Sequence, residues 1–216
     1  MRLADLLAPL APALCAGCGA SAGSAEPLCG RCRAGLTWLG PEPVRTAAIT
    51  VWAPVAYEGP ARALVRALKF GGAWRAAETM AAQIAANAPP SCLKVHMEPL
   101  GRIVLVPVPL HPRRERRRGY DQAALLARAL GKRTGLDVSE CLTRTGSAAA
   151  QVGRNRTERL AGPPGTIHAS FQPPKRALLV DDVVTSGGTL AACAAALRAA
   201  GTRQVSAIAY ARTPGR

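Results

Sequence analysis

The chain has 216 residues, of which 49% are hydrophobic and 19% are charged. These proportions are typical of a globular protein with one substantial core, and they exclude a disordered or fibrous chain. The net charge of +15 indicates a polyanionic partner, either a nucleic acid or a phosphorylated small molecule. Aromatic residues make up 4% of the chain, which argues against a surface built mainly to stack bases.

The N-terminal segment resembles a secretory signal, because Arg2 is followed by leucines and alanines. Asp5 and Pro9 interrupt this apolar run, and Cys15 follows it at once in a motif that requires the segment to be retained. The sequence has no apolar run of about eighteen residues, the length that a transmembrane helix needs. We therefore expect a short arm packed on the domain, no membrane span and a cytoplasmic location.

Four of the seven cysteines form two Cys-x-x-Cys pairs, with ten residues between the pairs. Each pair presents two thiolates from one tight turn, which is the arrangement of a tetrahedral zinc site. Two disulfides or a redox dithiol are the alternatives, but a cytoplasmic chain disfavours the first and the doubled spacing disfavours the second. The sequence therefore predicts a structural zinc ribbon with the ligands Cys15, Cys18, Cys29 and Cys32.

After a linker at Pro41 and Pro43, apolar runs of strand length alternate with segments of helical periodicity. Strands are expected at 48–55, 102–108, 141–144, 166–171, 177–180 and 204–211, and helices at 61–70, 73–86, 120–132 and 189–200. Such alternation predicts a doubly wound, mostly parallel α/β sheet. The polar segment 147–164 is expected to be a mobile loop with some helix. We divide the chain into an arm with a zinc ribbon, residues 1–43, and an α/β domain, residues 44–216.

The most informative segment is 177–190, where a buried strand delivers two acids and then a Thr/Ser/Gly loop opens a helix. Ligands of open α/β sheets bind at the carboxyl ends of strands. The free amides of such a loop suit a phosphate, and glycines let it approach. The acids suit the vicinal hydroxyls of a ribose and could reach Mg²⁺ directly or through water. The alternative is a strand end with an acidic cap and a glycine turn. The predicted ribose 5-phosphate site consists of Asp181, Asp182, Thr185, Ser186, Gly187, Gly188 and Thr189.

This segment resembles the phosphoribosyl pyrophosphate signature of type I phosphoribosyltransferases, and the whole chain is similar to the ComF family of competence-associated proteins. The other segments that carry the resemblance are the cysteine pairs, Leu68–Gly71, Val106–Pro109, Arg118–Gln122, Gln151 with Arg159, and Ala211-Arg212. Asp121 stands where the family usually has Asn, residues 185–189 read Thr-Ser-Gly-Gly-Thr instead of Thr-Thr-Gly-Ala-Thr, and Gly162 stands where an Asn is expected after Arg159.

The resemblance implies a phosphoribosyltransferase-like sheet with the zinc ribbon near the site, and a role in the uptake of transforming DNA. It also implies a pyrophosphate loop after the strand that ends at Val108. The arginines between 113 and 118 could compensate the charge of pyrophosphate. A solvated basic turn or a nucleic-acid contact is the alternative. Lys69 either points into the site or is a cation favoured at a helix C-terminus. The residues assigned to the pyrophosphate loop are Pro109, Leu110, His111, Arg118 and Gly119.

Two functions are consistent with these residues. The first is binding of magnesium and phosphoribosyl pyrophosphate, with Asp181 and Asp182 as the catalytic acids of a phosphoribosyltransferase and with residues 143–159 closing over the site. The second is a non-catalytic module that binds single-stranded DNA and DNA-uptake proteins and uses the fold as a sensor of phosphoribosyl pyrophosphate. The net charge and the arginine run support the second, because they suit contact with a phosphate backbone.

Overall fold

The structure is a computed structural model of the chain, and it describes residues 14–22, 26–46, 48–70, 73–93, 101–145, 167–170 and 172–214. The main sheet contains β1 (Val44–Arg45), β2 (Thr50–Trp52), β3 (Val55–Ala56), β4 (Val104–Pro107), β5 (Asp137–Val138), β8 (Arg176–Val184) and β9 (Gln204–Arg212). Its strand order is β1-β2-β9-β8-β4-β5, and β3 also pairs with β9.

The pairing of these strands is mostly parallel. The pairs β2–β9, β3–β9, β8–β9, β4–β8 and β4–β5 are parallel, whereas β1 runs antiparallel to β2. The predicted mostly parallel α/β sheet is therefore confirmed.

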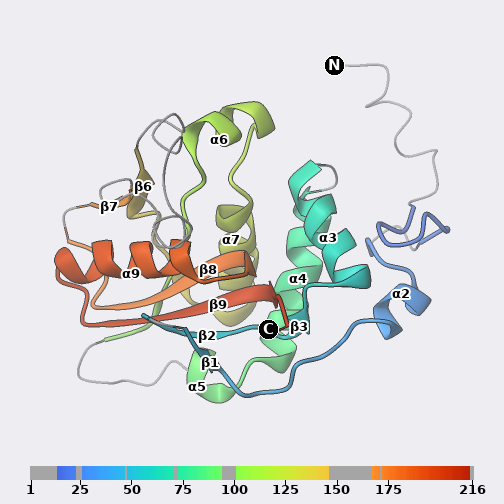
Figure 1. Cartoon of the computed structure of the whole chain (residues 1–216), viewed down its shortest axis with the longest axis horizontal. Coiled ribbons are helices and arrows are strands. Elements are labelled where there is room, and N and C mark those ends of the chain that lie inside the picture. The colour runs from blue at the N-terminus through green and yellow to red at the C-terminus, as the bar shows by residue number, and fades with distance from the viewer. Residues whose placement is uncertain are drawn as a thin grey trace.

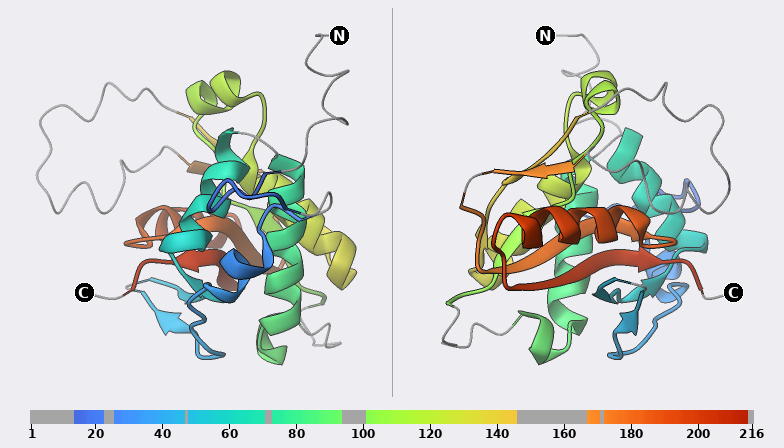
Figure 2. Two further views of the ribbon diagram at one scale, coloured as in Figure 1. Left: turned by 90° about the vertical axis from the view of Figure 1, so that its right-hand side faces the viewer. Right: turned by 60° about the vertical axis from the view of Figure 1, so that its left-hand side comes forward.

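Helices cover both faces of the sheet (Figures 1 and 2). They are α2 (Gly30–Ala34), α3 (Gly59–Phe70), α4 (Ala73–Asn87), α5 (Pro90–Leu93), α6 (Pro112–Arg118), α7 (Gln122–Thr134) and α9 (Gly188–Ala199). Helix α9 lies on one face, and α4 and α7 lie on the other. Among the helices in the described part of the chain, none has the length and apolar character needed to cross a bilayer.

The central strand β8 contributes to two hydrophobic cores. Leu178 and Val180 are buried with side chains of α3, α4 and α7, whereas Ala177 and Leu179 are buried with side chains of α9. This burial on both faces explains why the strand is apolar without interruption. Because successive side chains of a strand point to opposite faces, the same alternation continues into the two acids near its carboxyl end.

The expected strand 48–55 is instead two short strands, β2 and β3. Pro54 lies between them, and a proline has no N–H to donate to the ladder of a sheet. The expected strands 141–144 and 166–171 form a separate antiparallel pair, β6 (Leu142–Arg144) and β7 (Ile167–Ala169). The expected arm before residue 14 and the loop 147–164 lie outside the described residues, as do Gly71, Gln151, Arg159 and Gly162.

The arginine run, which we expected to be a loop, forms helix α6. His111 is its N-cap, and Nδ1 of this side chain accepts the N–H of Arg113 at 3.2 Å. Pro112 occupies the first helical position, and Gly119 ends the helix in the left-handed conformation, with φ 85°. These are ordinary start and stop signals of a helix, and the interpretation of the run as a charged turn overlooked them.

Candidate functional site

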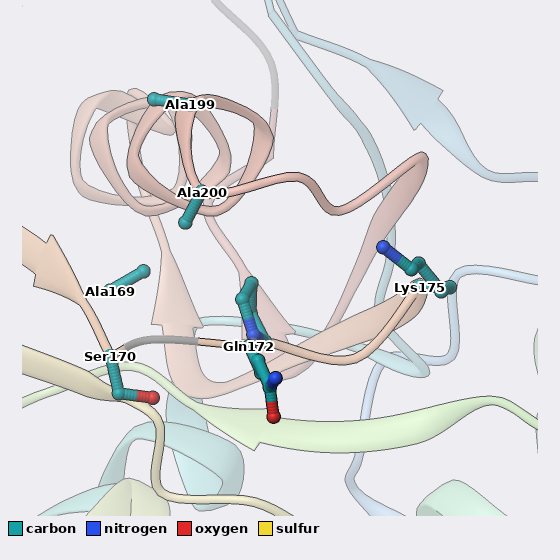
Figure 3. Close-up of a pocket in the computed structure, with 7 residues that line it drawn as sticks. Ala169, Ser170, Gln172, Lys175, Ala199 and Ala200 are labelled. Atoms are coloured by element: carbon teal, nitrogen blue, oxygen red, sulfur yellow. The ribbon is translucent and has the colours of Figure 1, made fainter.

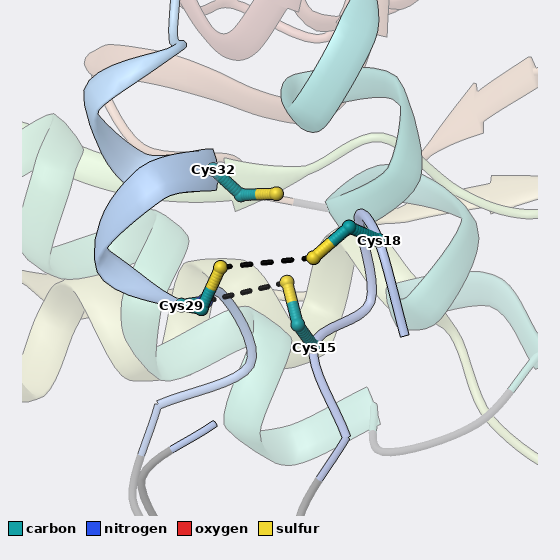
Figure 4. A group of neighbouring side chains, drawn as sticks. All are labelled: Cys15, Cys18, Cys29 and Cys32. Carbon is teal, nitrogen blue, oxygen red and sulfur yellow. Dashed lines mark hydrogen bonds between the residues drawn. The ribbon is translucent and has the colours of Figure 1, made fainter. Parts of the chain in front are cut away.

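Four cysteine side chains converge in the N-terminal module (Figure 4). Their sulfur atoms all lie within 4.8 Å of one another, and those of Cys18 and Cys29 are 3.7 Å apart. A tetrahedral zinc ion with Zn–S bonds of about 2.3 Å places its sulfur ligands about 3.8 Å apart. The predicted ligands Cys15, Cys18, Cys29 and Cys32 therefore form a cluster that could hold a zinc ion.

Backbone amides point at the sulfur of Cys15. The N–H groups of Gly17 and Cys29 lie 3.4 Å and 3.3 Å from it. Burial disfavours the thiolate of Cys15, but the backbone donors outweigh burial and lower its pKa to about 6. Burial and the neighbouring thiols raise the pKa of Cys32 to about 12. Four thiolates this close to one another need a cation to compensate their charge, which a bound metal would supply.

The cysteine module, which is the described part of residues 14–43, packs against the beginning of α3. Leu28 and Leu36 of the module are buried in the same hydrophobic cluster as Leu64 of α3. The hydroxyl of Thr37 donates to the carboxylate of Glu58 at 2.8 Å, directly before the helix begins. The module is thus packed against the helix whose other end reaches the acids of β8.

Asp182 lies near the carboxyl end of β8 and on the face that α3 covers. Its Oδ2 is 2.7 Å from the ammonium nitrogen of Lys69, in the last turn of α3. The Asp182 side chain is 5% exposed and that of Lys69 is 26% exposed. The structure therefore agrees with both alternatives for Lys69, which contacts an acid of the candidate site and also lies in the last turn of a helix.

Asp181 has different surroundings from its neighbour. Its Oδ1 accepts the backbone N–H of Asp182 at 2.8 Å. Burial, followed by the nearby charge of Asp182, raises the pKa of Asp181 well above its ordinary value. The two acids, which the sequence presents as an equivalent pair, are therefore distinct: Asp182 is paired with a cation, and Asp181 is held toward its neutral form.

The loop after β8 joins the acids to α9. Thr185 and Ser186 are exposed, and Gly187 is the left-handed N-cap of α9, with φ 75°. A Cβ on Gly187 would lie 3.1 Å from the methyl group of Thr46, so both the conformation and the space favour glycine. Among the described residues, no side chain caps the first turn of α9. Its first amides, at Gly188 and Thr189, therefore remain suited to an anion.

The loop after β4 lies beside these groups, because β4 and β8 are hydrogen-bonded neighbours. The N–H of Leu110 in this loop donates to Oδ2 of Asp121 at 2.8 Å. A pocket of about 350 Å³ opens next to the loop, between Pro109 and Leu110 on one side and Thr143 and Arg144 of β6 on the other. The predicted pyrophosphate loop thus follows the strand next to β8, whose carboxyl end carries the acids.

The turn that follows α6 contacts the last residues of α3. The hydroxyl of Tyr120 donates to the carbonyl oxygen of Leu68 at 2.8 Å. The guanidinium of Arg118 lies 5.6 Å from the centroid of the Phe70 ring and also contacts the side-chain oxygen of Gln122. The sequence motifs contain all of these residues, but nothing in their spacing showed that the two segments meet. His111, by contrast, serves as a helix cap.

A larger pocket, of about 730 Å³, lies at the opposite end of β8 (Figure 3). Gln172 and Lys175 line it, together with Ala199 and Ala200 where α9 ends. Lys175 directly precedes β8, so this pocket is at the amino end of the strand. Because ligands of open α/β sheets bind at carboxyl ends, we place the candidate site at the acids and not in the larger pocket.

Comparison with known proteins gives one curated relative, and no family model matches the chain. Competence protein F of Haemophilus influenzae is 30% identical over 113 residues. The match covers 50% of this chain and 49% of the relative, so it spans about half the length of that protein. Together with the four-cysteine cluster, this match confirms the resemblance of the chain to the ComF family.

Proposed function

We propose that the chain binds phosphoribosyl pyrophosphate with magnesium and is the site of phosphoribosyl transfer to an acceptor, in a cytoplasmic role linked to competence and DNA uptake. The observation that carries this proposal is the adjacency of two loops. Residues 181–189 end β8 and open α9, and residues 109–111 follow the neighbouring strand β4. A ribose 5-phosphate on the first loop would direct its pyrophosphate toward the second. The similarity to a competence protein supports the biological role.

The proposed reaction exchanges one bond at the anomeric carbon. The bond between C1 of the ribose and the pyrophosphate oxygen breaks, and a lone pair of the acceptor forms the new bond to C1. Pyrophosphate leaves with the electron pair, and the proton of the acceptor passes to solvent. Magnesium on the pyrophosphate would compensate the charge of the leaving group.

The residues of the chain take separate roles in this proposal. Asp182 accepts hydrogen bonds from the ribose diol, and Asp181 contributes beside it. The hydroxyls of Thr185, Ser186 and Thr189 and the first amides of α9 hold the 5-phosphate. The loop after β4 and the guanidinium of Arg118 face the pyrophosphate.

Calorimetry with magnesium and phosphoribosyl pyrophosphate tests the proposal. The wild type should bind, and Asp181→Ala/Asp182→Ala should lose affinity by about tenfold or more, because the diol loses the acidic side chains that accept its hydrogen bonds. Zinc content and circular dichroism should be unchanged, and Asp137→Ala, at an exposed position of β5, should bind as the wild type does. Equal binding by the double variant would rule out the assigned site. Release of pyrophosphate across a panel of acceptors tests the transfer step.

A second function is favoured by the surface around α6 and the start of α4. Phe70 and Trp74 are 70% and 63% exposed. Each has a guanidinium at its ring: Arg118 lies 5.6 Å from Phe70, and Arg75 lies 5.3 Å from Trp74. Exposed aromatic rings among arginines are typical of surfaces that bind single-stranded nucleic acids. In this alternative the chain binds single-stranded DNA without catalysis and responds to phosphoribosyl pyrophosphate.

Binding of a single-stranded oligonucleotide at two salt concentrations, with and without phosphoribosyl pyrophosphate, separates the two functions. The DNA-binding alternative requires affinity that falls steeply with salt. It also requires that Trp74→Ala weaken binding while Trp38→Ala, an exposed tryptophan outside α3, α4 and α6, does not. Salt-independent or undetectable binding would eliminate it.

A further inference from the structure

Three consecutive residues at the end of α3 each contact a different part of the candidate site. The carbonyl of Leu68 accepts a hydrogen bond from Tyr120, and the ring of Phe70 lies beside Arg118. Lys69, between them, reaches Asp182. The contacts on either side hold the helix end in place, so the ammonium of Lys69 is presented to the acids from a fixed backbone.

The ion pair is mostly withdrawn from water. At 2.7 Å, with Asp182 5% exposed, it is a charge-assisted contact in a region where an unpaired carboxylate would be strongly disfavoured. Lys69 also lies in the last turn of its helix, where a cation is favoured by the helix dipole. The lysine is therefore the counter-ion of Asp182 before any ligand arrives.

This arrangement does not fit direct coordination of magnesium by the same carboxylate oxygen. A divalent ion bound there would lie within a few ångströms of the ammonium and would have to displace it. Magnesium prefers to retain several waters and to bind through few carboxylates and the phosphates of a substrate. The site thus already holds a cation at the position where a metal would bind directly.

We propose that Lys69 is the permanent counter-ion of Asp182, which fixes this carboxylate for a ribose diol and excludes a directly bound divalent ion from it. Magnesium then reaches the site on the pyrophosphate of the ligand and not on the free protein. The identity of the ligand rests on the proposed function, whereas the exclusion of a metal ion by Lys69 does not.

Two measurements test the role of Lys69, both on the full chain loaded with zinc. The first titrates Mn²⁺, as a paramagnetic probe for magnesium, and follows free Mn²⁺ by electron paramagnetic resonance. The second measures the affinity for ribose 5-phosphate without any divalent ion. Lys69→Met is compared with Lys69→Arg, which keeps the charge, and with Lys132→Met, which removes an exposed lysine from the last turn of α7.

The wild type should bind no Mn²⁺ at the acids, and Lys69→Met should gain a site that Lys69→Met/Asp182→Asn lacks. The affinity for ribose 5-phosphate should fall about tenfold or more in Lys69→Met and change by less than about threefold in Lys69→Arg and Lys132→Met. Wild-type protein that binds Mn²⁺ at the acids as tightly as Lys69→Met, or Lys69→Met that binds ribose 5-phosphate normally, would overturn the proposal.

Unfolding of the single variant is itself informative. If Lys69→Met is destabilised by an uncompensated Asp182, adding Asp182→Asn should restore stability, whereas a simple helix-end role predicts no restoration. If the wild type binds neither ribose 5-phosphate nor phosphoribosyl pyrophosphate, the proposed function fails, while the Mn²⁺ titration still decides whether Lys69 excludes a metal ion.

Discussion

Asp121 joins the loop after β4 to the helix that follows it. One carboxylate oxygen accepts the N–H of Leu110 at 2.8 Å. The other accepts the N–H groups of Ala123 and Ala124, at 2.8 Å and 3.1 Å, and so caps α7. A single side chain therefore sets the position of the predicted pyrophosphate loop relative to the rest of the core.

Asp121→Ala should lower the free energy of unfolding by about 2 kcal/mol, because a helix cap contributes about 1 kcal/mol and a further charged hydrogen bond a similar amount. Asp121→Asn should lower the free energy of unfolding by less, since the amide retains one oxygen that can cap the helix. Urea denaturation measures both, with exposed Asp137→Ala as the control. If both variants lower the free energy of unfolding equally, Asp121 does not stabilise the protein by capping α7.

Gly17→Ala should reduce the zinc content of the purified protein. A Cβ at this position would lie 2.8 Å from the sulfur of Cys32, so the first loop would have to move away from its partner cysteine. Gly30→Ala is the matched control, because a Cβ there meets nothing within 4 Å. Metal analysis and release of zinc to a chelator give the comparison. If both variants retain zinc equally, the close approach at Gly17 does not limit the cluster.

Asp181→Asn should stabilise the ligand-free protein at neutral pH. The pKa of Asp181 is raised above 3.8 in the folded state, chiefly by burial, so the folded protein binds this proton more tightly than the unfolded chain does. The stability that Asp181 contributes is therefore present below the unfolded pKa and is lost as pH rises through the folded pKa. Asparagine does not titrate and keeps an oxygen for the N–H of Asp182.

Thermal unfolding at pH about 7.5 and about 4 measures this effect. The melting temperature of Asp181→Asn should exceed that of the wild type at the higher pH, and the difference should shrink at the lower one. Asp137→Asn, at an exposed position, should show no such pH dependence. If Asp181→Asn raises the melting temperature equally at both pH values, ionisation of Asp181 is not the cause of the increase.

The sequence predicted the parts of the fold that local patterns determine. The continuous apolar runs at β4 and β8 identified buried strands, and the cysteine spacing identified the cluster at 15–32. Helix α6 was not predicted from the sequence, because the five arginines were interpreted only as a source of positive charge. His111, Pro112 and Gly119 are nevertheless start and stop signals of a helix. Short strands such as β5 carry too few residues to show a period.

The site was predictable as a set of residues but not as a set of contacts. That Asp181 and Asp182 lie at a carboxyl strand end follows from the run before them. The pairing of Lys69 with Asp182 joins residues more than a hundred positions apart. It depends on how α3 packs on the sheet, as does the contact of Tyr120 with Leu68. Such contacts are set by tertiary packing, for which a single sequence holds no periodic signal.

Helix α3 has twelve residues, and at 1.5 Å per residue it is about 18 Å long. Glu58, directly before its first turn, accepts a hydrogen bond from Thr37 of the cysteine module, and its last turn carries the lysine that pairs with Asp182. Because a helix is stiff over this length, we expect oxidation of the thiols or loss of a bound zinc ion to shift Lys69 relative to Asp182. Preparations of the same protein that differ in the oxidation or zinc content of these cysteines should therefore differ in apparent affinity for phosphoribosyl pyrophosphate.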